Sequence, residues 1–225
     1  MVYIIMESMG SFRFSDVGDF DTHIKQSIRG YTQLTEDIIE MSPHFIDKYS
    51  RTVDFGCSTG KMLQEIGIRN KWTGSYTGID IEKCFQGRYS GTKAEFITGD
   101  IFDYDIPDNT RLALMVFTLQ FLPPTRRIEL LSRIYTSLQH GGALVVSEKI
   151  HSTNSTIQDI ISMLHLEYKR EFFTSDEILD KEKSLRGVMK INTREAIIES
   201  IKTAGFTHVD TFWQQHNFIG IIAIK

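Results

Sequence analysis

VDFGCSTGKML, residues 53–63, is the stretch that decides the fold class of this chain. It begins as a short apolar strand, passes through a turn bounded by two glycines, and continues into an amphipathic helix. Glycine lets the backbone approach a ligand closely, and the first amides of a helix offer hydrogen-bond donors. The pattern therefore predicts an α/β sheet with a ligand site at the carboxyl end of this strand.

The spacing of the glycines separates three kinds of ligand. A P-loop for ATP has four residues between its glycines and Ser or Thr after its lysine, whereas three residues separate Gly56 from Gly60 and Met62 follows Lys61. A dinucleotide site has the pattern GxGxxG, whereas this turn has GxxxG. The looser turn favours S-adenosylmethionine (SAM), which contains no pyrophosphate, and a turn without a ligand is the alternative.

Two aspartates follow the next predicted strands. Asp80 comes 24 residues after Gly56, where an acidic residue typically holds ribose hydroxyls. Asp100 ends the third predicted strand, where its carboxylate can accept a hydrogen bond from an adenine amino group. Either residue alone would more often cap a helix or form a turn. Because three strand ends carry suitable residues in the right order, SAM is the expected ligand.

Strands and amphipathic helices alternate on both sides of this region, which predicts an α/β fold with a mostly parallel sheet. The last helix, residues 194–204, precedes an antiparallel strand pair, a feature of the Rossmann-like fold of SAM-dependent methyltransferases. We expect seven strands and one domain over residues 1–225. Its predicted parts are a helical N-terminal extension (11–50), the Rossmann core (51–150), a helical insertion and candidate dimer interface (151–192), and the final helix and strand pair (193–225). Expected strands lie at 53–55, 76–79, 96–97, 112–117, 143–147, 209–213 and 218–224, and a covering helix carries Ile128, Leu131, Ile134 and Leu138.

Composition excludes several classes of protein. The chain has 225 residues, 41% of them hydrophobic, and a formal net charge of −4, so it lacks the basic excess of a protein that grips nucleic acid by itself. Its two cysteines and seven histidines show no metal-ligand spacing, so we expect no metal. The N-terminal apolar run is too short for a signal peptide or a membrane span, so we expect a cytoplasmic protein.

The end of the fourth predicted strand is unusually apolar. N-methyltransferases often place Asn/Asp-Pro-Pro-aromatic here to hold an amine, whereas residues 116–122 read VFTLQFL. Pro123 and Pro124 follow and predict the start of the next helix. Thr118 and Gln120 are the polar residues of this lip, and hydrogen bonding at the strand end is their structural alternative. The lip shows no general base, so the catalytic residues are unknown at this level.

Six stretches together resemble the carboxy-S-adenosyl-L-methionine (carboxy-SAM) synthase family, over almost the whole chain from about residue 11. The resemblance implies a homodimer that converts SAM and prephenate to carboxy-SAM and phenylpyruvate, for a second enzyme that modifies wobble uridine in tRNA. It implies ligand contacts at Tyr31, Gly56, Cys57, Ser58, Asp80, Ile81, Asp100, Ile101, Val116 and Phe117. The shared stretches are residues 30–31, 54–58, 99–101, 117–122, 141–149 and 204–206.

Two positions depart from the family pattern. Val116 stands where the family has an asparagine that contacts the ligand. The family also uses an arginine from the helical insertion of the neighbouring subunit to clamp the new carboxylate, and Lys183 aligns with it. Lysine keeps the charge but lacks the planar two-donor fork. Lys181 or Arg186 would take this role if the helix were rotated, and a solvated helix face is the alternative for all three.

Three functions remain open on the sequence. The first is a carboxy-SAM synthase acting on a prephenate-like substrate. The second is a SAM-dependent methyltransferase with a small-molecule acceptor, which Val116 favours because it removes a polar contact to the carboxylated product. The third is a SAM-binding protein without turnover. Direct binding of nucleic acid is not expected in any of them.

Overall fold

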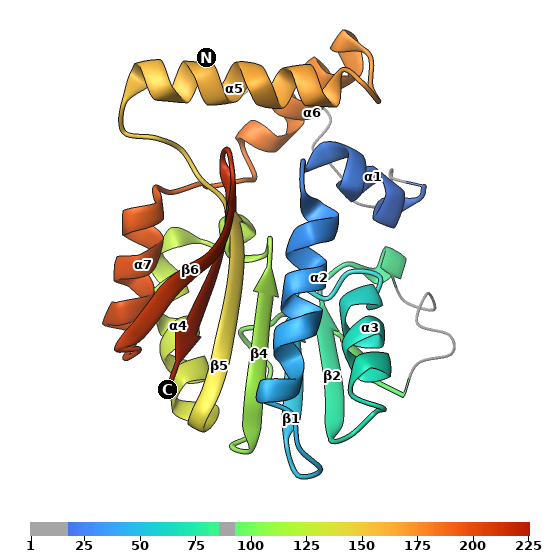
Figure 1. The fold of residues 1–225 in the computed structure, drawn as a ribbon, viewed down its shortest axis with the longest axis vertical. Coiled ribbons are helices and arrows are strands. Elements are labelled where there is room, and N and C mark those ends of the chain that lie inside the picture. Colours follow the sequence, from blue (N-terminus) through green and yellow to red (C-terminus); the bar gives the residue numbers. More distant parts are fainter. Residues whose placement is uncertain (1–17, 86–92) are drawn as a thin grey trace, which may run out of the picture.

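A computed structural model of the chain describes residues 18–85 and 93–225. Its centre is a seven-stranded sheet in the order β3-β2-β1-β4-β5-β7-β6 (Figure 1). Five neighbouring strands run parallel, and β7 runs antiparallel to both β5 and β6. The predicted mostly parallel sheet with an antiparallel C-terminal strand is therefore confirmed. The strands are β1 (Arg51–Phe55), β2 (Ser75–Asp80), β3 (Glu95–Thr98), β4 (Thr110–Val116), β5 (Leu138–Lys149), β6 (His208–Gln215) and β7 (Phe218–Ile224).

Helices cover both faces of the sheet. One buried cluster joins α2 and α3 to the sheet, and a second joins α4 and α7 to the opposite face (Figure 1). Their bounds are α1 (Phe20–Ser27), α2 (Tyr31–Met41), α3 (Lys61–Arg69), α4 (Pro124–Ser137), α5 (Ser155–Lys169), α6 (Ser175–Arg186) and α7 (Arg194–Thr203), with short 3₁₀ turns η2 (Ser42–His44), η3 (Lys83–Phe85) and η4 (Leu119–Phe121).

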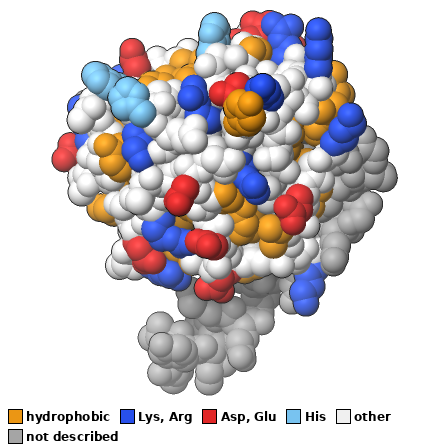
Figure 2. Space-filling view, turned by 90° about the horizontal axis from the view of Figure 1, so that it is seen from below, with side chains coloured by type: hydrophobic (Ala, Val, Ile, Leu, Met, Phe, Trp, Pro, Cys, Tyr) orange, Lys and Arg blue, Asp and Glu red, His pale blue; other side chains and the backbone are white. Residues whose placement is uncertain are grey.

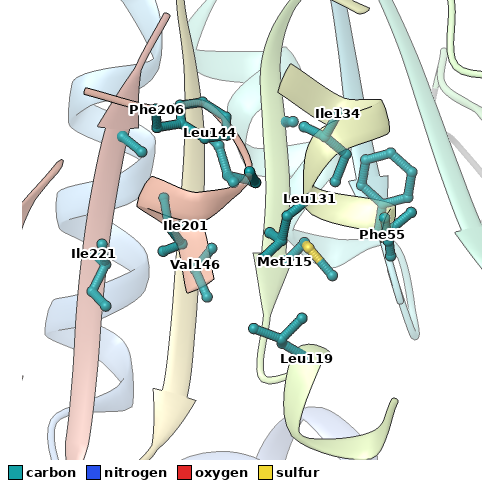
Figure 3. Close-up of a cluster of buried hydrophobic side chains, with 14 of the residues drawn as sticks. Phe55, Met115, Leu119, Leu131, Ile134, Leu144, Val146, Ile201, Phe206 and Ile221 are labelled. Atoms are coloured by element: carbon teal, nitrogen blue, oxygen red, sulfur yellow. The ribbon is translucent and has the colours of Figure 1, made fainter. Parts of the chain in front are cut away.

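Strand β4 shows why the central strands are apolar throughout. Successive side chains of a strand point to opposite faces of the sheet. Ala113 and Met115 belong to the cluster under α4 and α7, whereas Leu112 and Leu114 belong to the cluster under α2 and α3. Figure 3 shows the first cluster, in which Met115 lies near Leu131 of α4. A strand covered on both faces needs a continuous apolar run.

Most of the predicted strands extend further in the structure, β5 by five residues at its start, and three predicted ends lay one residue too far along the chain: Phe117, Leu138 and Ala204. The expected helix through Leu138 ends at Ser137, because Leu138 takes an extended conformation (φ −67°, ψ 136°) and pairs with Thr110 as the first residue of β5. Leu138 still packs in the core, so its helical spacing could not distinguish a helical residue from a buried strand residue. The strand expected through Phe117 ends at Val116, since Phe117 has φ +58°.

The predicted helical insertion forms α5 and α6, and α5 lies across the carboxyl ends of the strands (Figure 1). The hydroxyl of Tyr168 on α5 donates to the carbonyl oxygen of Lys25 on α1 at 2.8 Å. The N-terminal extension and the insertion therefore meet above the sheet. Residues 11–17 of the predicted extension lie outside the described residues.

The surface carries charges of both signs. On the face opposite α5, acidic and basic side chains are interspersed (Figure 2). Within the ranges that the structure describes, no helix combines the length and the apolar character needed to cross a membrane.

Candidate functional site

A cavity of about 550 Å³ lies where the carboxyl ends of β1, β2 and β4 meet α1, α5 and α6. This is the crevice in which open α/β sheets bind ligands. Lys183 is the one predicted contact that lies outside its wall. The other ten all line the cavity: Tyr31, Gly56, Cys57, Ser58, Asp80, Ile81, Asp100, Ile101, Val116 and Phe117.

The turn after β1 is built for close approach of the backbone. Gly56 has φ +80°, a conformation that side chains disfavour. A Cβ atom at this position would stand 2.4 Å from Oγ1 of Thr118, at the end of β4. The Thr118 hydroxyl in turn donates to the carbonyl oxygen of Phe55 at 2.8 Å. The residue that follows β4 thus packs directly on the turn. Thr118 forms a hydrogen bond at the strand end, which is the structural alternative that the sequence analysis gave for it.

Asp80 connects this turn to the end of β2. One carboxylate oxygen accepts from the backbone N–H of Ser58 at 2.8 Å, and the other accepts from that of Glu82 at 2.9 Å. Burial raises the pKa of Asp80, and these backbone hydrogen bonds offset part of that rise. Each oxygen keeps a further acceptor site, so the carboxylate fits two vicinal ribose hydroxyls.

Asp100 is more loosely held. Its side chain is exposed, and Oδ1 accepts from the backbone N–H of Phe102 at 2.9 Å. Asp100 therefore stabilises a turn, which is one of the two roles that such a residue has without a ligand. Asp100 still lines the cavity, so one carboxylate oxygen remains available to a ligand.

Asp54 is a cavity residue that the sequence did not single out. It is 3% exposed, and burial together with the charge of Asp80 raises its pKa to about 8. Its carboxyl group therefore holds its proton more readily than an ordinary aspartate does. A cationic ligand beside it would favour the ionised form, so this wall suits a ligand that carries a positive charge. In the sequence Asp54 stands inside a strand, where its side-chain direction could not be assigned.

A cluster of charged side chains forms another part of the same cavity wall. Lys149 ends β5, Lys169 ends α5, and Lys181 and Glu182 lie on α6. Oε1 of Glu182 stands 3.1 Å from Nζ of Lys169 and 3.8 Å from Nζ of Lys149. Burial lowers the pKa of Lys149, and burial together with Lys169 lowers that of Lys181 to about 8. We call these four residues the lysine cluster.

Two histidines flank the lysine cluster. Nε2 of His23 on α1 contacts Nζ of Lys181, and burial followed by the charge of Lys181 lowers the pKa of His23 to about 4. Burial lowers the pKa of His165 to about 3, and its ring packs edge-on against Phe218 with centroids 5.2 Å apart. Both imidazoles are therefore neutral at pH 7, so His23 accepts the hydrogen bond from Lys181.

The apolar lip is held from behind by buried polar groups. Arg127, 4% exposed, donates to the carbonyl oxygens of Leu122 (3.1 Å), Gln120 (3.4 Å) and Lys190 (2.7 Å). The Gln120 side chain accepts from the backbone N–H of Lys149 at 3.0 Å. Both polar residues of the lip, Thr118 and Gln120, are thus bonded to the backbone. The lip therefore contributes an apolar surface to the cavity wall.

Aromatic rings complete the wall beside the lip. Phe117 stacks on Tyr31 with centroids 6.2 Å apart and packs edge-on against Phe218 at 5.9 Å. Burial raises the pKa of Tyr31 above its ordinary value, so its hydroxyl keeps its proton. Among the described residues, no group of three His, Cys, Asp or Glu side chains is arranged to hold a metal ion.

The chain is similar to known proteins in sequence and in fold. The carboxy-S-adenosyl-L-methionine synthase of Shewanella woodyi is 35% identical over 97% of this chain and 95% of its own length. The enzyme of the same name from Shewanella oneidensis is 34% identical over 98% of this chain and 96% of its own length. A methyltransferase domain family matches residues 52–142. A SAM-dependent methyltransferase structure from Archaeoglobus fulgidus superposes with a TM-score of 0.63 at 14% identity, over 92% of this chain and 100% of that chain.

Proposed function

This chain belongs to the carboxy-S-adenosyl-L-methionine synthase family, and we propose that it transfers the carboxyl group of prephenate to the methyl carbon of SAM. The bond from the prephenate ring to that carboxyl group breaks, the ring hydroxyl leaves with the proton lost from the methyl group as water, and the ring becomes that of phenylpyruvate. The chain is a SAM-dependent transferase with the methyltransferase fold. The observation that carries the proposal is one cavity that joins the predicted SAM contacts to a cluster of three lysines. Acidic and amide groups suit the nucleoside and cationic parts of SAM, whereas the lysines suit a substrate with two carboxylates.

Different residues of the cavity would bind different parts of SAM. Asp80 and the turn from Gly56 to Ser58 would hold the ribose and the amino-acid part of SAM, and Asp100 would hold the adenine. When bound, SAM supplies a methyl carbon that its sulfonium group activates. The apolar lip and the rings of Tyr31, Phe117 and Phe218 would keep water away from that carbon.

The proposed product is a metabolite for a second enzyme, which would use it to carboxymethylate wobble uridine in tRNA. Direct binding of tRNA by this chain is not part of the proposal. In support, the formal net charge is −4, and charges of both signs alternate on the face shown in Figure 2.

We further propose that the chain works as a homodimer through the outer face of α5 and α6. Large apolar side chains lie exposed on both helices, and exposed apolar surface is typical of an interface. Lys183 on α6 is 48% exposed and contacts Asp180 at 3.4 Å, so it can extend toward a partner subunit. The exposed apolar residues of this face are Ile157, Ile160, Met163, Leu164 and Leu179.

Incubation of the pure protein with SAM and prephenate should yield a product 44 mass units heavier than SAM, together with phenylpyruvate. Mass spectrometry of the reaction mixture checks both products, and omission of prephenate is the control. Absence of the heavier product at any enzyme level would contradict the proposal. A second reaction contains SAM and a mixture of small acceptors but no prephenate. Formation of S-adenosylhomocysteine there would favour the alternative function, a methyltransferase with a small-molecule acceptor.

Lys183→Ala should weaken carboxy-SAM binding at least about tenfold and leave SAM binding nearly unchanged, because only the carboxylated ligand needs the clamp. Lys183→Arg should strengthen carboxy-SAM binding, since arginine adds a second parallel donor. Calorimetric titration with both ligands checks this, and light scattering should give twice the chain mass. Equal effects of the substitution on the two affinities would show that Lys183 does not bind the carboxylate.

A further inference from the structure

We propose that Glu182 is an internal stand-in for a substrate carboxylate, which a dianionic second substrate displaces from Lys149 and Lys169. The inference rests on the proposed function for the identity of that substrate, a dicarboxylate. It assigns a role to a residue that the predicted contacts did not include, and it follows from how the lysine cluster is built.

The first observation is a difference in burial between the partners. The Lys169 side chain is 4% exposed and that of Lys149 is 15% exposed, so both ammonium groups lie against the interior of the cavity wall. The Glu182 side chain is 31% exposed, although its Oε1 reaches both ammonium groups. When the ion pairs break, the carboxylate can therefore move into water while the two lysines stay at the cavity wall.

The second observation is a mismatch of charge. Among the described residues, a single carboxylate pairs with both Lys149 and Lys169, so the two ammonium groups share one anion. Buried ammonium groups are costly unless each is paired. A dianion would place one carboxylate on each lysine and free Glu182. The count is limited to the two lysines that pair with Glu182; Nζ of Lys181 contacts the imidazole of His23 instead.

The third observation is that Glu182 is held as an anion. Burial by itself would raise the pKa of this carboxyl, but Lys149 and Lys169 outweigh burial and lower it. The ionised carboxylate has the chemistry of the substrate group that it would mimic, and it lines the same cavity as the predicted SAM contacts. A substrate with one carboxylate would replace Glu182 with no gain in charge pairing. The arrangement therefore selects for dianions.

Glu182→Gln tests the inference, because glutamine keeps the shape of the side chain and competes poorly for the two ammonium groups. With S-adenosylhomocysteine present to prevent turnover, calorimetry at pH 7 should show prephenate binding about tenfold more tightly to the variant than to the unmodified protein. Phenylpyruvate, which has one carboxylate, should gain less. Glu195→Gln is the matched control, since Glu195 is 69% exposed, pairs with Arg194 at 3.0 Å and lies on α7.

Unchanged or weaker binding of prephenate by a folded Glu182→Gln protein would overturn the inference, and so would the absence of binding by both proteins. Glu182→Asp provides a second test if the glutamine variant does not fold, because it keeps the charge and shortens the reach by one methylene. Prephenate should bind it more tightly than the unmodified protein, and equal or weaker binding counts against displacement.

The experiments distinguish failure of the proposed synthase activity from failure of the proposed displacement of Glu182. Tighter prephenate binding by Glu182→Gln without any carboxy-SAM formed by the unmodified protein would uphold displacement and reject the synthase. Carboxy-SAM formation with no change of prephenate affinity in Glu182→Gln would uphold the synthase and reject displacement.

Discussion

Gly56→Ala should weaken SAM binding by about a hundredfold or more. At φ +80° an alanine is strained by about 1–2 kcal/mol relative to glycine. Its Cβ would also stand 2.4 Å from Oγ1 and 2.7 Å from Cγ2 of Thr118, which is anchored by its hydrogen bond to Phe55. The turn must therefore shift, and the Ser58 amide would move away from Asp80. Calorimetric titration with SAM measures the loss.

Two variants separate this effect from a general loss of folding. Gly99→Ala is the matched control, because a Cβ there meets nothing within 4 Å, and its SAM affinity should change little. Adding Thr118→Ala to Gly56→Ala removes both clashing atoms and should restore part of the binding, with the backbone strain remaining. Normal SAM affinity in Gly56→Ala would show that the turn does not approach the ligand.

Arg127→Met should lower the free energy of unfolding by about 3–5 kcal/mol. Arg127 is 4% exposed and donates to three backbone carbonyls, two in the lip and one at Lys190 beyond α6. The substitution removes the side-chain donor of the Leu122 and Lys190 carbonyls, whereas the Gln120 carbonyl keeps the backbone N–H of Lys190 at 2.7 Å. It also removes the positive charge that partly offsets the effect of burial on the pKa of Glu148, which burial raises well above its ordinary value. Urea denaturation at pH 7 measures the change.

The neighbouring arginine supplies the control. Arg126 pairs with Glu129 at 3.3 Å, and both side chains are about half exposed (44% and 51%), so Arg126→Met should cost less than about 1 kcal/mol. Arg127→Met combined with Glu148→Gln should recover part of the loss, because the double variant has no buried carboxyl whose ionised form would lack a counter-charge. A loss in Arg127→Met no larger than that in Arg126→Met would contradict the structural role of Arg127.

Most of the fold could be predicted because its signals are local. The apolar run of β4 and the glycine turn after β1 each depend on a few adjacent residues, and their physical causes act within one element. The exceptions are boundaries. Leu138 has the spacing of a helical core residue and also fills the core as the first residue of β5, so periodicity alone could not place it.

The candidate site likewise has a part that the sequence predicts and a part that it does not. The carboxyl ends of parallel strands meet at one edge of a sheet, so the order of Gly56, Asp80 and Asp100 was enough to predict a common cavity. No such rule brings the end of β5, the end of α5 and the middle of α6 together. The sequence therefore did not predict the lysine cluster as a unit. Lys181 was a candidate for the clamp only, and Lys149 was the last residue of a stretch shared with the family.

The sequence by itself determined the sheet, the glycine turn and the residues at the strand ends, because chain connectivity and handedness fix where those ends lie. Only the tertiary structure decided which charges share the cavity. The pKa of Asp54 rises to about 8 through burial and the nearby charge of Asp80, and Glu182 pairs with two lysines of other elements through packing. Burial and Coulomb energy depend on distances through space, and those exist only once the chain has folded.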